Sequence, residues 1–367
     1  MASNQIQFDV YTCVRTYYKD SSCTKCLDIC PIEDTIYVEN GKINLKQENC
    51  VFCGGCVGAC PTEAFSLNGF NPADFFEKMV ETGETLISCK SNVPCLSSID
   101  PQYLVSLAIK KDSDIYMDKG HCSECFIGKL LPNIEKNVEE ANYILETLKV
   151  PHRIKLEDIK YELPKTEEQK KERRNFLKRF SKTTAGLAFW MISQNIPQIE
   201  KLEEEKDEDY YKNIVEEKVY PKKREILIQT LKESEIDFTD KELEVDKISF
   251  TSQKWIDNKK CTNCMICINI CPTGALQSGK DRLQVLFQPS ECIKCRICHE
   301  VCPEECIHLA EKLSIDDFVN NTILLAEHIM IPCSECLVPF SYKGDSVVCP
   351  RCKQLEDEIK DLLKIGE

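Results

Sequence analysis

One short cysteine motif recurs along the chain and constrains the fold more than any other feature. Two-residue gaps let a tight loop wrap three corners of a metal cluster, and the three-residue gap before proline turns the fourth thiolate away. A copy that lacks its first cysteine comprises Cys23, Cys26 and Cys30. The three full C-x2-C-x2-C-x3-C-P copies are Cys50, Cys53, Cys56 and Cys60, then Cys261, Cys264, Cys267 and Cys271, then Cys292, Cys295, Cys298 and Cys302.

The motif resembles the run of bacterial two-cluster ferredoxins. In that family three cysteines of one run and the last cysteine of its neighbour hold each [4Fe–4S] cluster. Because the runs form two tandem pairs, the resemblance implies two ferredoxin modules and four clusters. Cys306 is surplus and is expected to be a buried thiol, and His299 a hydrogen-bonding neighbour. In the second module the implied ligand sets are Cys261, Cys264, Cys267 and Cys302, and Cys292, Cys295, Cys298 and Cys271.

The first module needs a substitute for its missing cysteine. Asp20 stands at the empty position, and Cys13 lies further upstream. We favour Cys13, since thiolate is the usual cluster ligand, with Asp20 as the alternative. Cys13-Val-Arg15, the two-cluster run and Val93-Pro94-Cys95-Leu96 together resemble ferredoxin-domain proteins of anaerobic bacteria and archaea. In those proteins a small α/β domain with further cysteines follows a ferredoxin head, which implies electron transfer and supports Cys13.

Composition indicates a metal protein of a reducing compartment. The 367 residues include 25 cysteines, and the polar start MASNQIQFDV has neither the basic nor the apolar region of a secretory signal. The longest nearly apolar run, 185–192, is far too short to span a membrane. We expect a cytoplasmic protein. Its net charge of −14 suits docking to basic patches on redox partners and argues against nucleic-acid binding.

The hydrophobic pattern over 73–157 predicts a small α/β unit. Its strands alternate with helices, so the sheet is expected to be parallel. Strands are expected at 85–88, 114–117 and 152–156, and helices from Asp100-Pro101 and over 126–148. Ligands gather at the carboxyl edge of such sheets. That edge would carry Cys89, Cys95, Cys122 and Cys125. The pattern favours a further iron–sulfur cluster, with zinc or unligated thiols as alternatives.

Residues 158–250 have no cysteine and many charges, and we interpret them as a helical linker. Residues 173–178 (RRNFLK) resemble the core of a twin-arginine export signal, but such signals work at the amino terminus. The alternatives are a packed helix with a solvated basic face and a basic amphipathic segment over 170–192. The latter would place the protein at the inner face of the membrane.

The tail carries two C-x2-C pairs twelve residues apart, the pattern of a structural zinc ribbon. Its ligands would be Cys333, Cys336, Cys349 and Cys352. Iron in a rubredoxin-like site would fit the same four thiolates.

Together these features predict an α+β multidomain chain. The expected parts are a ferredoxin module at 1–72, an α/β domain at 73–157, a linker at 158–250, a second ferredoxin module at 251–315 and a zinc-ribbon-like tail at 316–367. The expected function is a relay of single low-potential electrons between redox enzymes, as a non-catalytic, polyferredoxin-like subunit in anaerobic or respiratory metabolism. The alternatives are a reductase acting at Cys89–Cys125 and a regulatory or assembly factor with structural clusters.

Overall fold

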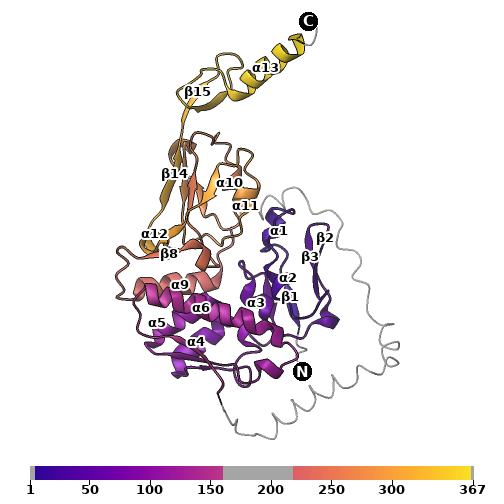
Figure 1. Cartoon of the computed structure of the whole chain (residues 1–367), viewed down its shortest axis with the longest axis vertical. Coiled ribbons are helices and arrows are strands. Elements are labelled where there is room, and N and C mark those ends of the chain that lie inside the picture. The colour runs from indigo at the N-terminus through magenta and orange to yellow at the C-terminus, as the bar shows by residue number, and fades with distance from the viewer. Residues whose placement is uncertain (1–4, 160–217, 365–367) are drawn as a thin grey trace, which may run out of the picture. The chain divides into compact units, whose positions relative to one another are not determined.

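The computed structural model describes residues 5–159 and 218–364 (Figure 1). By their contacts, Met1–Asp158 and Val215–Glu367 form one unit. This unit mixes helices with short strands, as the predicted α+β class requires. Within the described ranges, every helix is too short or too polar to cross a lipid bilayer. The twin-arginine-like motif and the expected membrane-contact segment 170–192 lie outside the described residues.

The first ferredoxin module is closed by its outer strands, which pair in antiparallel register. The predicted Asn-Gly hairpin is present between β2 and β3, with Asn40 and Gly41 both at positive φ, as a type I′ turn needs. In chain order the elements are β1 (Ile6–Phe8), α1 (Val14–Tyr17), α2 (Lys25–Ile29), β2 (Ile36–Glu39), β3 (Lys42–Leu45), η1 (Gln47–Asn49), α3 (Gly55–Ala59) and β4 (Phe65–Leu67).

The next segment is the predicted parallel α/β unit, with strand order β5-β6-β7. Helix α5 begins where expected, because the Asp100 side chain accepts the Gln102 N–H and Pro101 occupies the first turn. The elements are α4 (Pro72–Thr82), β5 (Leu86–Ile87), η2 (Leu96–Ser98), α5 (Pro101–Lys111), β6 (Ile115–Asp118), η3 (Cys122–Glu124), η4 (Gly128–Leu130), α6 (Leu131–Thr147) and β7 (Ile154–Glu157).

Residues 218–250 differ from the expected linker, because they are packed into the unit. Helix α9 (Lys222–Glu233) buries Ile226, Leu227 and Leu231 in the core shared by the first module and the α/β unit. Strand β8 (Glu242–Glu244) precedes η6 (Val245–Lys247) and pairs with β13 (Lys312–Ser314). Segments on both sides of the second module are therefore joined to one another.

The second ferredoxin module has its own core. Its outer strands β9 and β12 pair as β1 and β4 do in the first module. Its inner hairpin gains a third strand, β14, which the sequence boundaries had placed in the tail. The elements are β9 (Lys254–Ile256), α10 (Ile266–Asn269), β10 (Leu276–Ser278), η7 (Lys280–Arg282), β11 (Gln284–Phe287), α11 (Ile297–Glu300), β12 (Ile307–Leu309), α12 (Ile315–Asn320) and β14 (Ile323–Glu327).

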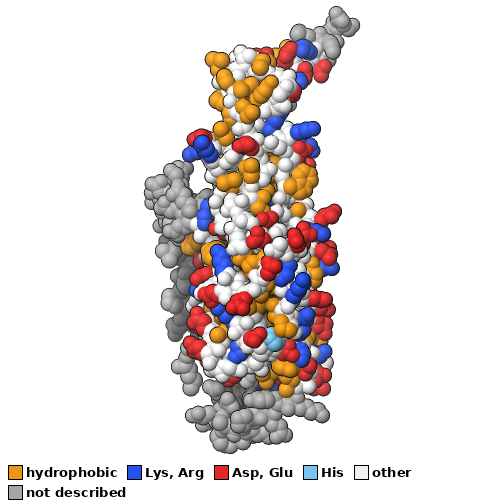
Figure 2. All heavy atoms as spheres, turned by 90° about the vertical axis from the view of Figure 1, so that its left-hand side faces the viewer, with side chains coloured by type: hydrophobic (Ala, Val, Ile, Leu, Met, Phe, Trp, Pro, Cys, Tyr) orange, Lys and Arg blue, Asp and Glu red, His pale blue; other side chains and the backbone are white. Residues whose placement is uncertain are grey.

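The tail is a hairpin followed by a helix: β15 (Ile329–Pro332), β16 (Pro339–Tyr342) and α13 (Pro350–Lys364). Hydrophobic side chains gather on the surface of this tail (Figure 2). Among them, Ile329, Leu337, Val338 and Val347 are exposed.

Candidate metal centres

In the first module, Cys13 joins Cys23, Cys26 and Cys60. Burial raises the pKa of the Cys26 thiol, and the neighbouring charges of Cys60, Cys23 and Cys13 raise it further. Burial, followed by the charges of Cys60 and Cys23, raises the pKa of the Cys13 thiol to about 11. Cys13 immediately precedes α1, and Cys60 ends α3, so these two helices bring thiols that are distant in sequence together. Asp20 is exposed, which favours Cys13 as the fourth ligand.

The other group of the first module comprises Cys30, Cys50, Cys53 and Cys56. The pKa of the Cys56 thiol is raised well above its usual range by burial and then by Cys53, Cys50 and Cys30. Helix α3, which carries Cys56, lies tightly against the α/β unit at Gly58. A Cβ on this glycine would approach the Ser97 carbonyl oxygen to 2.6 Å, so only glycine fits there.

A small cavity in the second module is lined by Cys261, Cys264, Cys267 and Cys302. Burial raises the pKa of Cys267 to about 12, and nearby cysteines add to the effect. The surplus Cys306 is buried, as expected, with its Sγ 3.5 Å from that of Cys302.

A second small cavity is lined by Cys271, Cys292, Cys295 and Cys298. Its wall also contains Lys254, which is only 4% exposed. Burial is the largest influence on the Cys292 thiol and raises its pKa. The Lys254 ammonium, a hydroxyl hydrogen bond and a backbone N–H outweigh it, so the pKa is lowered.

His299 also contacts this lysine, with its Nε2 3.3 Å from Lys254 Nζ. Burial lowers the pKa of His299 to about 4, and the charge of Lys254 contributes. A neutral imidazole can accept a hydrogen bond from the ammonium. This contact agrees with the expected role of His299 as a neighbour.

These four thiol groups fit [4Fe–4S] clusters in their donor chemistry. Each brings together three cysteines of one run, or their substitutes, and the last cysteine of the neighbouring run. A cubane offers one iron to each thiolate, and its positive core would stabilise thiolates whose pKa values are raised by burial and, to a smaller extent, by neighbouring thiols. Residues 21–65 and 253–303 each match a family described as a 4Fe-4S dicluster domain. A ferredoxin of Methanothermococcus thermolithotrophicus is 34% identical over 50 residues, which cover 82% of that protein and 13% of this chain.

The chain belongs to the dicluster ferredoxin family. The family matches account for the two ferredoxin modules, and they leave the α/β unit, α9 and the tail outside.

The α/β unit brings its four cysteines together at one edge of its sheet. Burial raises the pKa of Cys122 to about 11, and the charges of Cys95, Cys89 and Cys125 raise it further. Cys95 is buried, whereas Cys89 and Cys125 are exposed. Cys95 also raises the pKa of Cys53, to which burial contributes most, so this site adjoins a group of the ferredoxin module.

A buried ion pair lies under the same edge. Lys90 Nζ is 2.9 Å from Asp118 Oδ2, and the Ser88 hydroxyl donates to the same oxygen at 3.0 Å. The lysine offsets the negative charge of Asp118 beside the four thiols. This pairing is compatible with a cluster at the site. Among the described residues, the thiols found at the spacing of a single ion are those of the tail and not these four.

The tail holds four cysteine sulfurs within 4.8 Å of one another: Cys333, Cys336, Cys349 and Cys352. The Sγ atoms of Cys336 and Cys349 are 3.8 Å apart. Tetrahedral bonds of about 2.3 Å to one zinc ion separate two sulfurs by roughly 3.8 Å, so the spacing fits a single ion. Backbone N–H groups of Cys336 and Cys349 lower the pKa of the Cys333 thiol to about 6, which favours the thiolate form.

The two ferredoxin modules contact each other through a small apolar core. The Glu300 carboxylate of α11 accepts the backbone N–H of Ser22 at 3.2 Å. Cys23 of the first module and Cys295 of the second both pack against this core. Its buried members are Val14, Tyr17, Ile293 and Ile297.

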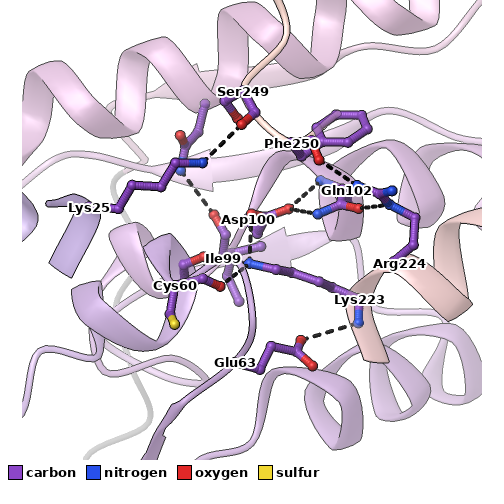
Figure 3. Close-up of polar contacts among 12 residues, drawn as sticks. Lys25, Cys60, Glu63, Ile99, Asp100, Gln102, Lys223, Arg224, Ser249 and Phe250 are labelled. Carbon is purple, nitrogen blue, oxygen red and sulfur yellow. Dashed lines mark hydrogen bonds and ion pairs between the residues drawn. The ribbon is translucent and has the colours of Figure 1, made fainter. Parts of the chain in front are cut away.

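Two buried cations at the start of α9 hold the surrounding segments together (Figure 3). Lys223 Nζ donates to the carbonyl oxygens of Gly58 at 3.0 Å and Cys60 at 2.8 Å, and pairs with Asp100 at 3.1 Å. The Glu63 carboxylate accepts the Lys223 backbone N–H at 3.1 Å. The first module, the α/β unit and α9 are thereby linked.

Arg224, which is 1% exposed, extends this link to the second module. It donates to Gln102 Oε1 at 2.7 Å and to the carbonyl oxygens of Phe250 at 2.6 Å and Cys292 at 2.9 Å. A further bond reaches the Ser290 carbonyl. The sequence does not single out Lys223, Arg224 or Lys254, because nothing in their local pattern separates a buried cation from a solvated one.

Proposed function

We propose that the chain is an electron-transfer subunit, related to polyferredoxins, that carries four [4Fe–4S] clusters and passes single low-potential electrons between redox enzymes. The observation that carries the proposal is the module contact, where Cys23 and Cys295 pack against one apolar core. Electron transfer weakens steeply with distance, so a direct contact between cluster-binding loops favours passage from one module to the other. The acidic chain would dock on basic partner surfaces in the cytoplasm.

The proposed ligands follow from the thiol groups. The first module would hold one cluster through Cys13, Cys23, Cys26 and Cys60 and another through Cys30, Cys50, Cys53 and Cys56. The second would use Cys261, Cys264, Cys267 and Cys302, and Cys271, Cys292, Cys295 and Cys298. Each bound cluster supplies a one-electron couple. The chain's own residues bury it, orient its thiolate ligands and set the local charge.

Iron analysis and a redox titration test this function. Anaerobically purified protein should contain about sixteen iron atoms in these sites, plus any iron of the α/β site and the tail. An electron paramagnetic resonance titration should show reversible one-electron couples. Clusters that stay silent across the accessible potential range would overturn electron transfer and favour a structural role.

A reductase acting at the α/β site is the second candidate. Cys89 and Cys125 are exposed beside the buried Cys95, and Cys89 borders a 300 Å³ pocket that includes Phe52 and Asn92. An exposed site of this kind could admit a substrate. Turnover of a disulfide or other small oxidant by the purified protein, lost on Cys89→Ser with the four ferredoxin couples intact, would establish this activity.

For the tail we propose a structural zinc ion, since four sulfurs at single-ion spacing suit tetrahedral zinc. Native mass spectrometry of the whole protein should show one zinc per chain. An additional iron with a rubredoxin-like visible spectrum would replace the zinc assignment with a further redox centre.

A further inference from the structure

Lys254 is a buried cation whose negative neighbours are thiols. Its Nζ donates to the Ser252 hydroxyl at 3.1 Å, and that hydroxyl oxygen lies 3.4 Å from Cys292 Sγ. The negative groups that act on Lys254 are Cys292, Cys298, Cys295 and Cys271. A buried charge is costly unless it is paired, so the partner of this ammonium is the set of cysteines.

The first module has an apolar residue at the equivalent position. Strand β9 pairs with β12 through Lys254 and Leu309, and β1 pairs with β4 through Ile6 and Leu67. Strand β4 begins five residues after Cys60, the last cysteine of its run, and β12 begins five residues after Cys302, the last cysteine of its own run. Lys254 therefore corresponds to Ile6, which is 1% exposed.

The thiol groups beside these two positions also correspond. Cys292, Cys295, Cys298 and Cys271 occupy the places in the second module that Cys50, Cys53, Cys56 and Cys30 occupy in the first. Apart from burial, the charges that raise the pKa of Cys56 come from other cysteines. The two sites thus share a fold and a ligand set. The Cys292 group has two buried cations beside it, Arg224 and Lys254, and Lys254 is the one whose equivalent in the first module is the apolar Ile6.

We propose that Lys254 makes the cluster of the Cys292 group easier to reduce than the equivalent cluster of the Cys50 group. The inference rests on the proposed function, since it concerns clusters that exchange electrons. A low-potential one-electron donor is oxidised, and the cluster with its four thiolates changes from a net charge of about −2 to about −3, with no proton required. A fixed cation in a site shielded from water stabilises the more negative state.

The size of the effect can be bounded. An opposite charge at close range shifts the pKa of a carboxyl group by about one to three units, and an added electron feels the same field. We therefore expect Lys254 to favour reduction at least tenfold, which is about 59 mV for a one-electron couple.

The test is a potentiometric titration of the whole protein, followed by electron paramagnetic resonance. Lys254→Ile installs the residue that the first module accepts, and should lower the potential of one couple by about 59 mV or more. Lys254→Arg keeps the charge and should restore most of the potential. Lys280→Met is the control, because it removes a positive charge from an exposed position of the second module. It should change the equilibrium constant for reduction of each cluster by less than threefold.

Cys292→Ser identifies the couple, since an altered ligand changes the spectrum of the cluster it holds. The couple marked by Cys292→Ser should be the one shifted by Lys254→Ile. If Lys254→Ile does not fold, Ile6→Lys gives the reciprocal measurement. It should favour reduction of one cluster of the first module at least tenfold.

If the wild-type protein shows reversible couples and Lys254→Ile leaves their potentials unchanged, the role of Lys254 is refuted and the proposed function stands. Equal shifts for Lys254→Ile and Lys254→Arg would equally refute a charge effect. A wild-type protein without reversible couples would instead overturn the proposed function.

Discussion

Replacing Arg224 by methionine should destabilise the folded unit more than any single change at an exposed charge. Methionine fills a similar volume but donates none of the hydrogen bonds that reach Gln102, Phe250, Ser290 and Cys292. Three buried carbonyl oxygens and one amide oxygen lose a donor. Each unsatisfied buried group costs about 1–3 kcal/mol, but such losses are not additive.

Neighbouring groups relax after such a change, and the buried charge itself disappears, which offsets part of the loss. A hydrogen bond from a charged donor contributes about 1.5–3 kcal/mol, and because the four losses are not additive we expect the free energy of unfolding to fall by about 3–5 kcal/mol. With a slope of about 2–3 kcal/mol per M urea, the midpoint should fall by roughly 1–2.5 M. The assay is anaerobic urea unfolding, followed by circular dichroism and by cluster absorbance.

The matched control lies two residues away on the same helix. Lys222 is about half exposed and pairs with Glu225, so Lys222→Met should cost about 0–1 kcal/mol. Because Arg224 donates a hydrogen bond to the Cys292 carbonyl, Arg224→Met should also make the second module unfold at a lower urea concentration than the first. Equal midpoints for Arg224→Met and Lys222→Met would refute the reasoning.

Three further predictions follow from individual sites. Cys13→Ala should lower iron content by up to about four atoms or convert one cluster, while Asp20→Ala should not; the opposite result in iron analysis would transfer the ligand role to Asp20. Cys333→Ser should release the tail metal and leave all ferredoxin couples in place, which metal analysis and a redox titration will show. Burial raises the pKa of Glu140 to about 7, above its ordinary 4.5, so its contribution to stability is full below about pH 4.5 and is lost as pH rises through 7. Between pH 5 and pH 8, the free energy of unfolding of Glu140→Gln should therefore rise relative to that of the wild type by up to about 3 kcal/mol, measured by urea unfolding. A difference that does not depend on pH would contradict the raised pKa of Glu140.

Local sequence patterns predicted the elements that local chemistry controls. The Asn40-Gly41 turn specifies its hairpin, and Asp100-Pro101 opens α5 as expected. The second predicted helix of the α/β unit begins at Leu131 and not at 126, because residues 128–130 form a 3-10 turn before Pro132. Helix α4 was not predicted, although Asn71 and Pro72 provide a cap and a first turn for it.

Long-range packing was the part that the sequence did not disclose. Lys222, Lys223 and Arg224 form one charged run, yet only the first is exposed. Their difference depends on carbonyl groups up to 165 residues away, which no local pattern reports. The cysteine groups could be anticipated because their spacing encodes the coordination, whereas the buried lysine beside one of two equivalent groups could not.

The contact between the ferredoxin modules joins non-equivalent ends. Cys23 belongs to the first run of its module, and Cys295 to the second run of its own. Contacts of this head-to-tail kind do not close on themselves as a two-fold contact does. The two outward ends therefore differ, so the chain has a polarity that a symmetric pair of modules would lack.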